Sequence, residues 1–181
     1  RQFVDRGEIP NMLLSGPPGI GKTTVAKALC NQLGADYYVI NGSDEGRFLD
    51  TVRNSAKNFA STVSLTSESK HKVIIIDEAQ AINDPATLEE LRLLLNFQLN
   101  DQFLLTLLLI GQPELREKIN SIKQLEQRIS VKFHLGPLKA EETESYIRKR
   151  LEKVNCSKTI FTDDALAAIH KASEGIPRSI N

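Results

Sequence analysis

Two short segments hold residues whose types and spacing suit phosphate chemistry. Residues 16–23 read GPPGIGKT, and further along the aliphatic run 73–76 is followed by Asp77 and Glu78. The first segment fits the pattern G-x-x-x-x-G-K-[ST], in which backbone N–H groups surround a phosphate, a lysine reaches the β- and γ-phosphates and a hydroxyl ligates Mg²⁺. An apolar run precedes the segment and a helical pattern follows it, as the pattern requires. Together the two segments predict a protein that binds and hydrolyses a nucleoside triphosphate.

Each residue type in segment 16–23 suits phosphate binding for a physical reason. Glycines let the backbone bend through conformations that other residues avoid, and they bring N–H groups around the phosphate at the positive end of the following helix. Lys22 adds a full positive charge, and the Thr23 hydroxyl is placed to ligate Mg²⁺. A glycine-rich turn with a surface lysine is the alternative, and the acidic motif argues against it. The predicted nucleotide-binding residues of this loop are Gly16, Pro17, Pro18, Gly19, Ile20, Gly21, Lys22, Thr23 and Thr24.

The run 73–76 is typical of a strand buried on both faces, which would deliver the two acids at its carboxyl end. In phosphate-loop enzymes the first acid holds the Mg²⁺ shell, and an adjacent Glu can orient or deprotonate the attacking water. A strand ending in solvated acids is the alternative for either acid alone. We therefore predict Thr23 and Asp77 as metal ligands, and Lys22 and Glu78 as catalytic residues.

Length and composition limit the remaining possibilities. The 181 residues, 40% of them hydrophobic, can bury one good core and a small second module. Even the apolar segment 103–110 is only strand-length, and the N-terminus does not resemble a signal peptide, so we expect a cytoplasmic protein with no membrane span. Because the 23 Lys and Arg balance the 23 Asp and Glu, a nucleic-acid contact would need a local patch. The two cysteines and three histidines are too scattered for a zinc site or a disulfide framework.

Strand and helix patterns alternate along the chain. This alternation predicts an α/β fold with a doubly wound, parallel, five-stranded sheet and a short, truncated C-terminal helical lid. Residues 1–136 would form the nucleotide-binding core and 137–181 the partial lid. The expected strands are 11–15, 37–40, 73–76, 103–110 and 129–135, and residues 61–72 are expected to be a connector. The expected helices are 23–33 with Gly34 as C-cap, a segment with apolar residues at 49, 52, 56 and 59, one beginning at Asp84 and Pro85, 140–154, one capped by Thr162, and one starting at 176–178.

These motifs resemble the AAA+ ATPases over essentially the whole chain. From about residue 7 to 78, segments 9–14, 41–44 and 58–61 resemble bacteriophage sliding-clamp-loader subunits, which are related to replication factor C small subunits. From about 77 to 181, segments 88–97, 111–116, 127–130 and 175–178 resemble ExeA/GspA-type general secretion ATPases, which are related to transposition ATPases. The change falls at the acidic motif that both families share. A mosaic or recombined chain and a divergent natural relative both fit this pattern.

The resemblance implies roles for further residues. Gln112 matches the polar sensor of the γ-phosphate and the attacking water, although clamp loaders usually have Asn there. Arg128 stands in the place of an arginine finger that serves a neighbouring subunit's ATP, although the flanking Ser and Cys of clamp loaders are Gln127 and Ile129 here. Arg178 matches a lid arginine that reaches the phosphates, which makes it both a nucleotide-binding and a catalytic candidate.

Simpler interpretations stand beside these roles. Arg128 could pair with Glu126 or another surface acid, and Arg178 could be an ordinary arginine at a helix end. Asn41 resembles a polar switch residue that holds the catalytic Glu inactive until a partner binds, but Asn is also a common turn residue.

The sequence as a whole predicts an AAA+ ATP hydrolase that uses ATP and Mg²⁺ to drive conformational change together with neighbouring AAA+ subunits. Clamp loading, with a sliding clamp and primed DNA as partners, is one downstream task. A secretion- or transposition-type regulator acting on an envelope partner is the second, and a nucleotide-binding module without turnover is the third.

Overall fold

The computed structural model describes residues 9–44, 50–56, 58–59, 72–94, 98–99, 102–103, 105–156, 158 and 160–181. These residues divide into two compact units. The described parts of Arg1–Gly16 and Lys22–His134 form the first unit, and those of Pro17–Gly21 and Leu135–Asn181 form the second. None of the helices in the described part of the chain combines the length and the apolar character needed to cross a bilayer.

The first unit is built on a five-stranded parallel sheet. Its strands are β1 (Met12–Ser15), β2 (Asp36–Asn41), β3 (Lys72–Asp77), β6 (Leu105–Gly111) and β7 (Val131–His134). They lie side by side in the order β2-β3-β6-β1-β7, and every pairing is parallel. The central strands β3 and β6 are almost wholly buried, as expected for parallel strands covered on both faces. The predicted five-stranded parallel α/β fold is confirmed.

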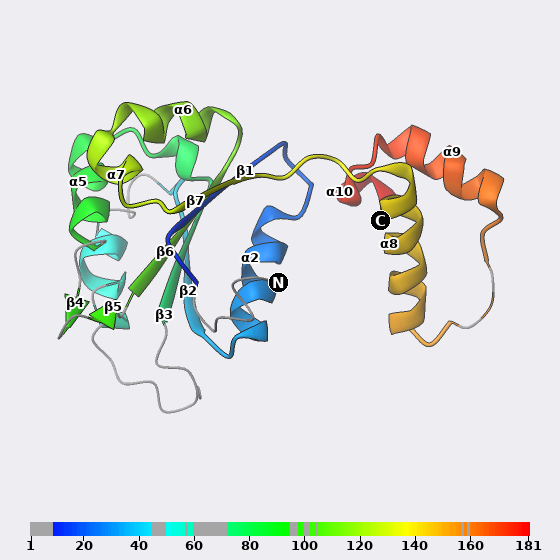
Figure 1. Cartoon of the computed structure of the whole chain (residues 1–181), viewed down its shortest axis with the longest axis horizontal. Coiled ribbons are helices and arrows are strands. Elements are labelled where there is room, and N and C mark those ends of the chain that lie inside the picture. Colours follow the sequence, from blue (N-terminus) through cyan, green and yellow to red (C-terminus); the bar gives the residue numbers. More distant parts are fainter. Residues whose placement is uncertain are drawn as a thin grey trace. The chain divides into compact units, whose positions relative to one another are not determined.

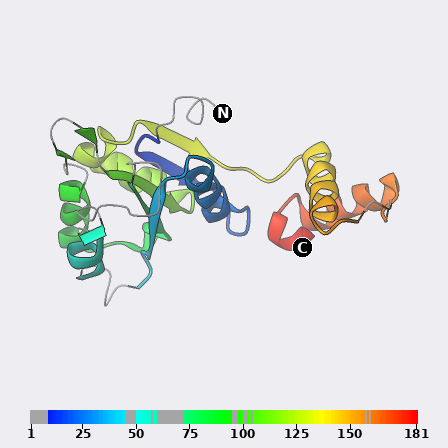
Figure 2. The same ribbon diagram turned by 90° about the horizontal axis from the view of Figure 1, so that it is seen from below.

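Helices cover both faces of this sheet. Helix α2 (Lys22–Gln32) lies on one face, and α5 (Pro85–Leu94), α6 (Glu114–Ser121) and α7 (Lys123–Glu126) lie on the other (Figure 1 and Figure 2). Alternate strand residues point to opposite faces, so each strand supplies two apolar layers. Ile74, Ile76, Leu107 and Leu109 belong to the cluster that also contains Leu91, Leu94 and Leu115, whereas their neighbours Ile75 and Leu108 are fully buried outside it.

Two predicted helix ends are confirmed. Gly34, just after α2, has φ +61°, which glycine adopts without the steric cost that a Cβ brings. Asp84 caps α5, because its carboxylate accepts hydrogen bonds from the backbone N–H of Ala86 and Thr87 at 3.3 and 2.9 Å. Pro85 then occupies the first helical position, where its missing N–H has no intrahelical partner to lose.

Several predicted boundaries were wrong. The fourth strand begins at Leu105, because Gln102–Phe103 (β5) instead pairs antiparallel with Gln98–Leu99 (β4). The fifth strand is shorter than predicted, since Ile129 packs into the core instead of extending the ladder. Lys72 belongs to β3 and not to the connector, and its ammonium donates to the carbonyl of Phe59.

Other differences concern helices. Residues Thr51–Ala56 form a π-helical turn inside the segment 49–59 that was predicted to be one regular helix, and residue 49 lies outside the described residues. The short 3₁₀ turn η2 (Ala79–Ala81) and helices α6 and α7 were not predicted. For α6 a signal was present, because Glu114 and Glu117 suit a helix N-terminus and Leu115 and Ile119 have helical spacing. Residues 61–71 of the predicted connector lie outside the described residues.

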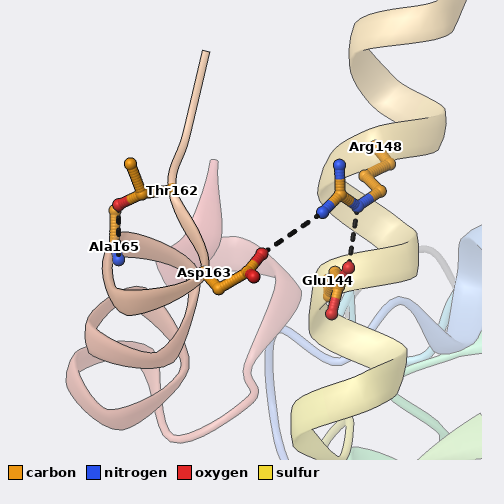
Figure 3. A network of polar contacts seen from close by, with 5 residues as sticks. All are labelled: Glu144, Arg148, Thr162, Asp163 and Ala165. Carbon is orange, nitrogen blue, oxygen red and sulfur yellow. Dashed lines mark hydrogen bonds and ion pairs between the residues drawn. The ribbon is translucent and has the colours of Figure 1, made fainter. Parts of the chain in front are cut away.

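The second unit contains α8 (Ala140–Lys153), α9 (Asp163–Ser173) and α10 (Pro177–Ile180), together with loop 17–21. The predicted cap at Thr162 is confirmed, because its hydroxyl accepts from the Ala165 N–H at 3.3 Å. Arg148 of α8 donates to Glu144 at 2.8 Å and lies 3.7 Å from Asp163 at the start of α9 (Figure 3). Exposed pairs of this kind contribute little to stability.

The two cysteines are both free thiols in different surroundings. Cys30 of α2 is fully buried, and burial raises the pKa of its thiol to about 11 because a thiolate loses its hydration there. Cys156, after α8, is only half-buried.

We expect Leu109→Ala to destabilise the first unit strongly. Leu109 lies in β6 at the centre of the sheet and is 1% exposed, so truncation removes buried methyl groups and leaves a cavity. Such changes cost about 2–5 kcal/mol of unfolding free energy. Val25→Ala is the control, because Val25 is 47% exposed and should change stability by less than about 0.5 kcal/mol. Urea unfolding followed by circular dichroism measures both variants, and equal effects would contradict the assigned core.

Candidate active site

Four strand ends lie along the carboxyl edge of the sheet. Ser15 at the end of β1 is level with Gly111 at the end of β6, and Asn41 at the end of β2 is level with Asp77 at the end of β3. The Gly16 N–H donates to the carbonyl of Gly111 at 3.2 Å, which continues the β1–β6 pairing into the loop. Residues that follow these strands are therefore brought together, and in parallel α/β sheets ligands bind at this edge.

The first turn of α2 contributes two predicted site residues. The Lys22 ammonium donates to the carbonyl of Gly16 at 2.9 Å. The Thr23 hydroxyl donates to the Asp77 carboxylate at 2.6 Å, although the two residues are 54 positions apart in sequence. Thr24, the next residue, is exposed in the same turn. The two sequence motifs thus meet through a direct hydrogen bond.

Glu78 follows Asp77 in a left-handed backbone conformation, with φ 52° and ψ 34°. For a residue other than glycine this region costs about 1–3 kcal/mol and persists only where the surroundings hold it. Two contacts hold it here, since the Glu78 N–H donates to Asp77 Oδ1 at 3.0 Å and the Glu78 carbonyl accepts from the Ala81 N–H at 2.9 Å. The turn separates the two carboxylates, so Asp77 faces Thr23 while Glu78 is exposed.

Gln80 joins this group of residues and was not predicted from the sequence. Its side-chain amide donates to Glu78 Oε2, and its Oε1 accepts from the backbone N–H of Gln112 at 3.1 Å. Its own carbonyl accepts from the Lys118 ammonium of α6 at 3.0 Å. Burial lowers the pKa of Lys118, because desolvation penalises the charged form. No general pattern assigns a role to the second residue after a strand-end acid, so only the structure reveals Gln80.

The two other polar candidates in the first unit differ in their surroundings. Gln112 directly follows β6 and is half-buried beside Gln80. Asn41 ends β2, and its side-chain oxygen accepts from the N–H and the hydroxyl of Ser43 at 3.1 and 2.9 Å. These are the bonds of an ordinary Asn turn, which was the simpler interpretation of this residue.

Thr23 and Asp77 also fit the chemistry of a divalent cation. Mg²⁺ prefers oxygen ligands and is usually held by one or two protein groups together with substrate phosphates. The hydroxyl of Thr23 and the carboxylate of Asp77 offer two such oxygens in contact with each other. Within the described part of the chain, no three His, Cys, Asp or Glu residues gather in a way that would hold a metal.

In the second unit, loop 17–21 lies against the last helix. Gly19 and Gly21 have φ +80° and +88°, where a side chain would strain the backbone. The Arg178 N–H donates to the carbonyl of Gly19 at 3.1 Å, and a Cβ added to Gly19 would lie 3.0 Å from Arg178 Cβ. Ile20 is buried, and Pro17, Pro18 and Gly19 are more exposed. Arg178 itself is exposed and touches the loop through its backbone and the base of its side chain.

Gly175, three residues before Arg178, also contacts the chain closely. It has φ +71°, and an added Cβ would overlap the carbonyl of Leu138. The Leu138 N–H donates to the Gly175 carbonyl at 2.9 Å. This close approach joins the segment before α8 to the segment before α10, and it explains the glycine.

Arg128 lies in the turn before β7, and its side chain is exposed. Its carbonyl accepts from the Asn11 side chain at 3.2 Å. Glu126, suggested as its partner, instead forms a salt bridge with Lys132 at 2.8 Å. The salt bridges found among the described residues do not include Arg128.

Comparison with known proteins relates the chain to ATPases. The family of ATPases associated with various cellular activities (AAA) matches residues 12–137. General secretion pathway protein A of Aeromonas hydrophila is 36% identical over 94% of this chain and 35% of its own length. A replication factor C small subunit of Methanocella arvoryzae is 34% identical over 99% of this chain and 53% of its own length. Relatives of both kinds therefore align on both sides of the acidic motif, and the chain spans about half or less of their length.

Solved structures show the same fold. The Thermotoga maritima RuvB Holliday junction branch migration motor superposes with a TM-score of 0.67 at 24% identity, covering 99% of this chain and 54% of that chain. The Aeropyrum pernix ORC2 protein superposes with a TM-score of 0.68 at 20% identity, covering 94% of this chain and 54% of that chain. The fold, the family match over most of the chain and relatives above 30% identity that align with nearly all of it lead to one conclusion: this chain belongs to the AAA family of ATPases.

Proposed function

We propose that the chain binds ATP with Mg²⁺ and hydrolyses it, using the residues at the carboxyl edge of the sheet. ATP binding is expected of an AAA family member, and turnover is the step that we propose for this chain. The observation that carries the proposal is the 2.6 Å hydrogen bond between Thr23 and Asp77, because it joins the phosphate loop to the acidic motif. A surface lysine in a glycine-rich turn would not require such a contact.

Loop 16–21 would surround the β-phosphate with backbone N–H groups, and the Lys22 ammonium would exchange its bond with the Gly16 carbonyl for contacts with the β- and γ-phosphates. Thr23 and Asp77 would hold Mg²⁺, which neutralises charge on the phosphates when it is bound. Thr24, exposed in the first turn of α2, would complete the nucleotide-binding set. The chain therefore supplies both positive charge and oriented dipoles.

Glu78 would act on the attacking water. Its carboxylate is exposed at the strand edge, and only Oε2 is engaged by Gln80. A carboxylate in this place can accept the proton of the water as it attacks the γ-phosphate. Gln112 directly follows the adjacent strand β6. As a sensor, it would hydrogen-bond to the γ-phosphate and to the attacking water.

Arg178 would couple the nucleotide to the C-terminal helices. The support for this role is the 3.1 Å hydrogen bond from the Arg178 N–H to the carbonyl of Gly19 in the phosphate loop. A conformational change of the loop would be felt directly at the start of α10. We therefore propose residues 1–136 as the ATPase core and residues 137–181 as a helical lid.

We further propose that the chain acts beside neighbouring AAA subunits and uses ATP to change their conformation. The exposed Arg128, which forms none of the salt bridges found among the described residues, suits an arginine finger that reaches a neighbour's ATP. Similarity to replication factor C small subunits favours a clamp loader, with a sliding clamp and primed DNA as partners. Similarity to general secretion pathway protein A favours a secretion-type regulator with an envelope partner. ATP turnover that rises when primed DNA and clamp are added together would select the clamp loader.

We expect Lys22→Ala to abolish most ATP binding, since it removes the full positive charge of the phosphate loop. Lys27→Ala is the matched control, because Lys27 is an exposed lysine of the same helix. Titration with a fluorescent ATP analogue in the presence of Mg²⁺ measures both affinities. If Lys22→Ala binds as tightly as Lys27→Ala, the loop does not bind phosphate as proposed.

We expect Glu78→Gln to bind ATP normally and to hydrolyse it about 10² to 10⁴ times more slowly, because an amide keeps the shape but cannot accept a proton. Asp77→Asn should instead weaken binding that depends on Mg²⁺. Phosphate release at saturating ATP and binding titrations with and without Mg²⁺ separate the two effects. Parental hydrolysis in both variants would mean that the acids are only structural.

We expect Arg128→Ala to bind ATP normally but to hydrolyse it up to about 10³ times more slowly wherever the finger is engaged by a neighbour. Mixing Arg128→Ala with Lys22→Ala chains should restore part of the activity, because each chain supplies the half-site that the other lacks. Phosphate release and light scattering follow activity and assembly in the mixture. Co-assembly without any recovery of turnover would exclude action across a subunit boundary.

A further inference from the structure

We propose that Gln80 is a positioning residue for ATP hydrolysis, which fixes the Glu78 carboxylate relative to the end of β6. The proposal rests on the assigned role of Glu78 as the group that activates water. It concerns a residue outside both sequence motifs. Three contacts define it: Gln80 to Glu78, Gln112 to Gln80, and Lys118 to Gln80.

Glu78 has conformational freedom that must be restricted before it can act as a base. Its side chain is exposed, so without a partner its carboxylate would sample several rotamers. A general base contributes fully only when its oxygen already points at the reacting group, because misplacement by about 1 Å can cost 10²-fold in rate. The amide of Gln80 engages Oε2 alone and leaves Oε1 available for a water molecule.

Gln80 is itself held at both ends of its side-chain amide. The amide nitrogen donates to Glu78, and Oε1 accepts from the Gln112 N–H at 3.1 Å. Since Oε1 accepts from a backbone group and the nitrogen donates to a carboxylate, the orientation of the amide is determined by its partners. Gly111 makes room for this arrangement, because a Cβ there would lie 2.5 Å from Oε1 of Gln80.

The turn that bears Gln80 is itself held in place by α6. The Lys118 ammonium of α6 donates both to the Gln80 carbonyl at 3.0 Å and to the Asn83 side chain at 2.8 Å. The 3₁₀ turn is thus fastened to α6, while the Gln80 side chain is fastened to the end of β6. Glu78 is consequently positioned by the two elements that also place Gln112.

This arrangement also distinguishes Gln80 from Asn41. Asn41 stands at the end of β2 and resembles a switch residue for the catalytic Glu, but its side-chain oxygen bonds to Ser43. The contact with the Glu78 carboxylate comes from Gln80 instead. A shift of the β6 end, where Gln112 lies, would therefore move the Glu78 carboxylate through Gln80.

Two variants separate the two bonds of the amide. Gln80→Leu removes both bonds at similar size, whereas Gln80→Glu keeps an oxygen for the Gln112 N–H but replaces the donor that faces Glu78 with a second carboxylate. We expect both variants to bind the fluorescent ATP analogue within about twofold of the parent. Single-turnover hydrolysis should slow by about 10-fold to 10²-fold in both. Gln124→Leu is the control, because Gln124 is an exposed glutamine of α7, and it should keep the parental rate.

A double-substitution cycle tests whether Gln80 acts through Glu78. In a Glu78→Gln background, Gln80→Leu should change the remaining hydrolysis by less than about twofold, because the group that it positions is already lost. If Glu78→Gln hydrolyses ATP slowly but both Gln80 variants hydrolyse it at the parental rate, this inference is overturned. The proposed function then remains intact. Faster hydrolysis in the Gln80 variants would also overturn the inference, since the contact would then restrain the carboxylate. Parental hydrolysis in Glu78→Gln would instead overturn the proposed function.

A measurement without turnover tests the contact itself. The side-chain amide signals of Gln80 in a ¹⁵N spectrum are assigned by their loss in Gln80→Leu. They should shift in Glu78→Ala and stay in place in Lys27→Ala. If the Gln80 side-chain signals do not shift in Glu78→Ala, the contact between Gln80 and Glu78 is excluded, whatever the hydrolysis rates are.

Discussion

The parallel alignment of β1, β3 and β6 is the constraint on which the rest of the site depends. Aliphatic strands that are buried on both faces carry little information about register, because a slip by one residue exchanges one buried face for the other. Polar contacts at the strand ends supply that information here. The Asn11 side chain accepts from the Leu107 N–H at 2.8 Å, and the Thr106 hydroxyl donates to the Ile9 carbonyl at 2.7 Å. At the opposite edge, Thr23 bonds to Asp77 and Gly16 bonds to Gly111.

Both ends of the ladder are therefore fixed by groups that are costly to leave unpaired. This has a direct consequence for the site. A register shift in β3 relative to β6 would move Asp77 away from the first turn of α2 and Gln80 away from Gln112. The same pairing that builds the core thus sets distances between side chains that come from four separate elements.

Features that depend on local pattern could be predicted from the sequence. The caps at Asp84 and Thr162, the glycine after α2 and the five parallel strands follow from residue types over a few positions. Features that depend on tertiary contacts outside the two motifs could not be predicted. The start of β6 at Leu105 reflects the short pairing between β4 and β5, and the role of Gln80 reflects a turn that orients its amide toward two other elements. The association of loop 17–21 with the C-terminal helices likewise requires contacts over more than 150 positions.

The different environments of the two thiols give the protein a ready-made attachment point for a spectroscopic probe. The thiolate is the nucleophile that attacks an alkylating reagent, so Cys30, which is fully buried and has a pKa of about 11, should resist modification while the fold is intact. Cys156 is half-buried just beyond α8. A maleimide dye added to the folded chain would therefore mark the unit that contains α8, without any engineered substitution. The fluorescence of that dye would report separately on the C-terminal helices, and later reaction of Cys30 would show when its buried position on α2 becomes accessible to the reagent.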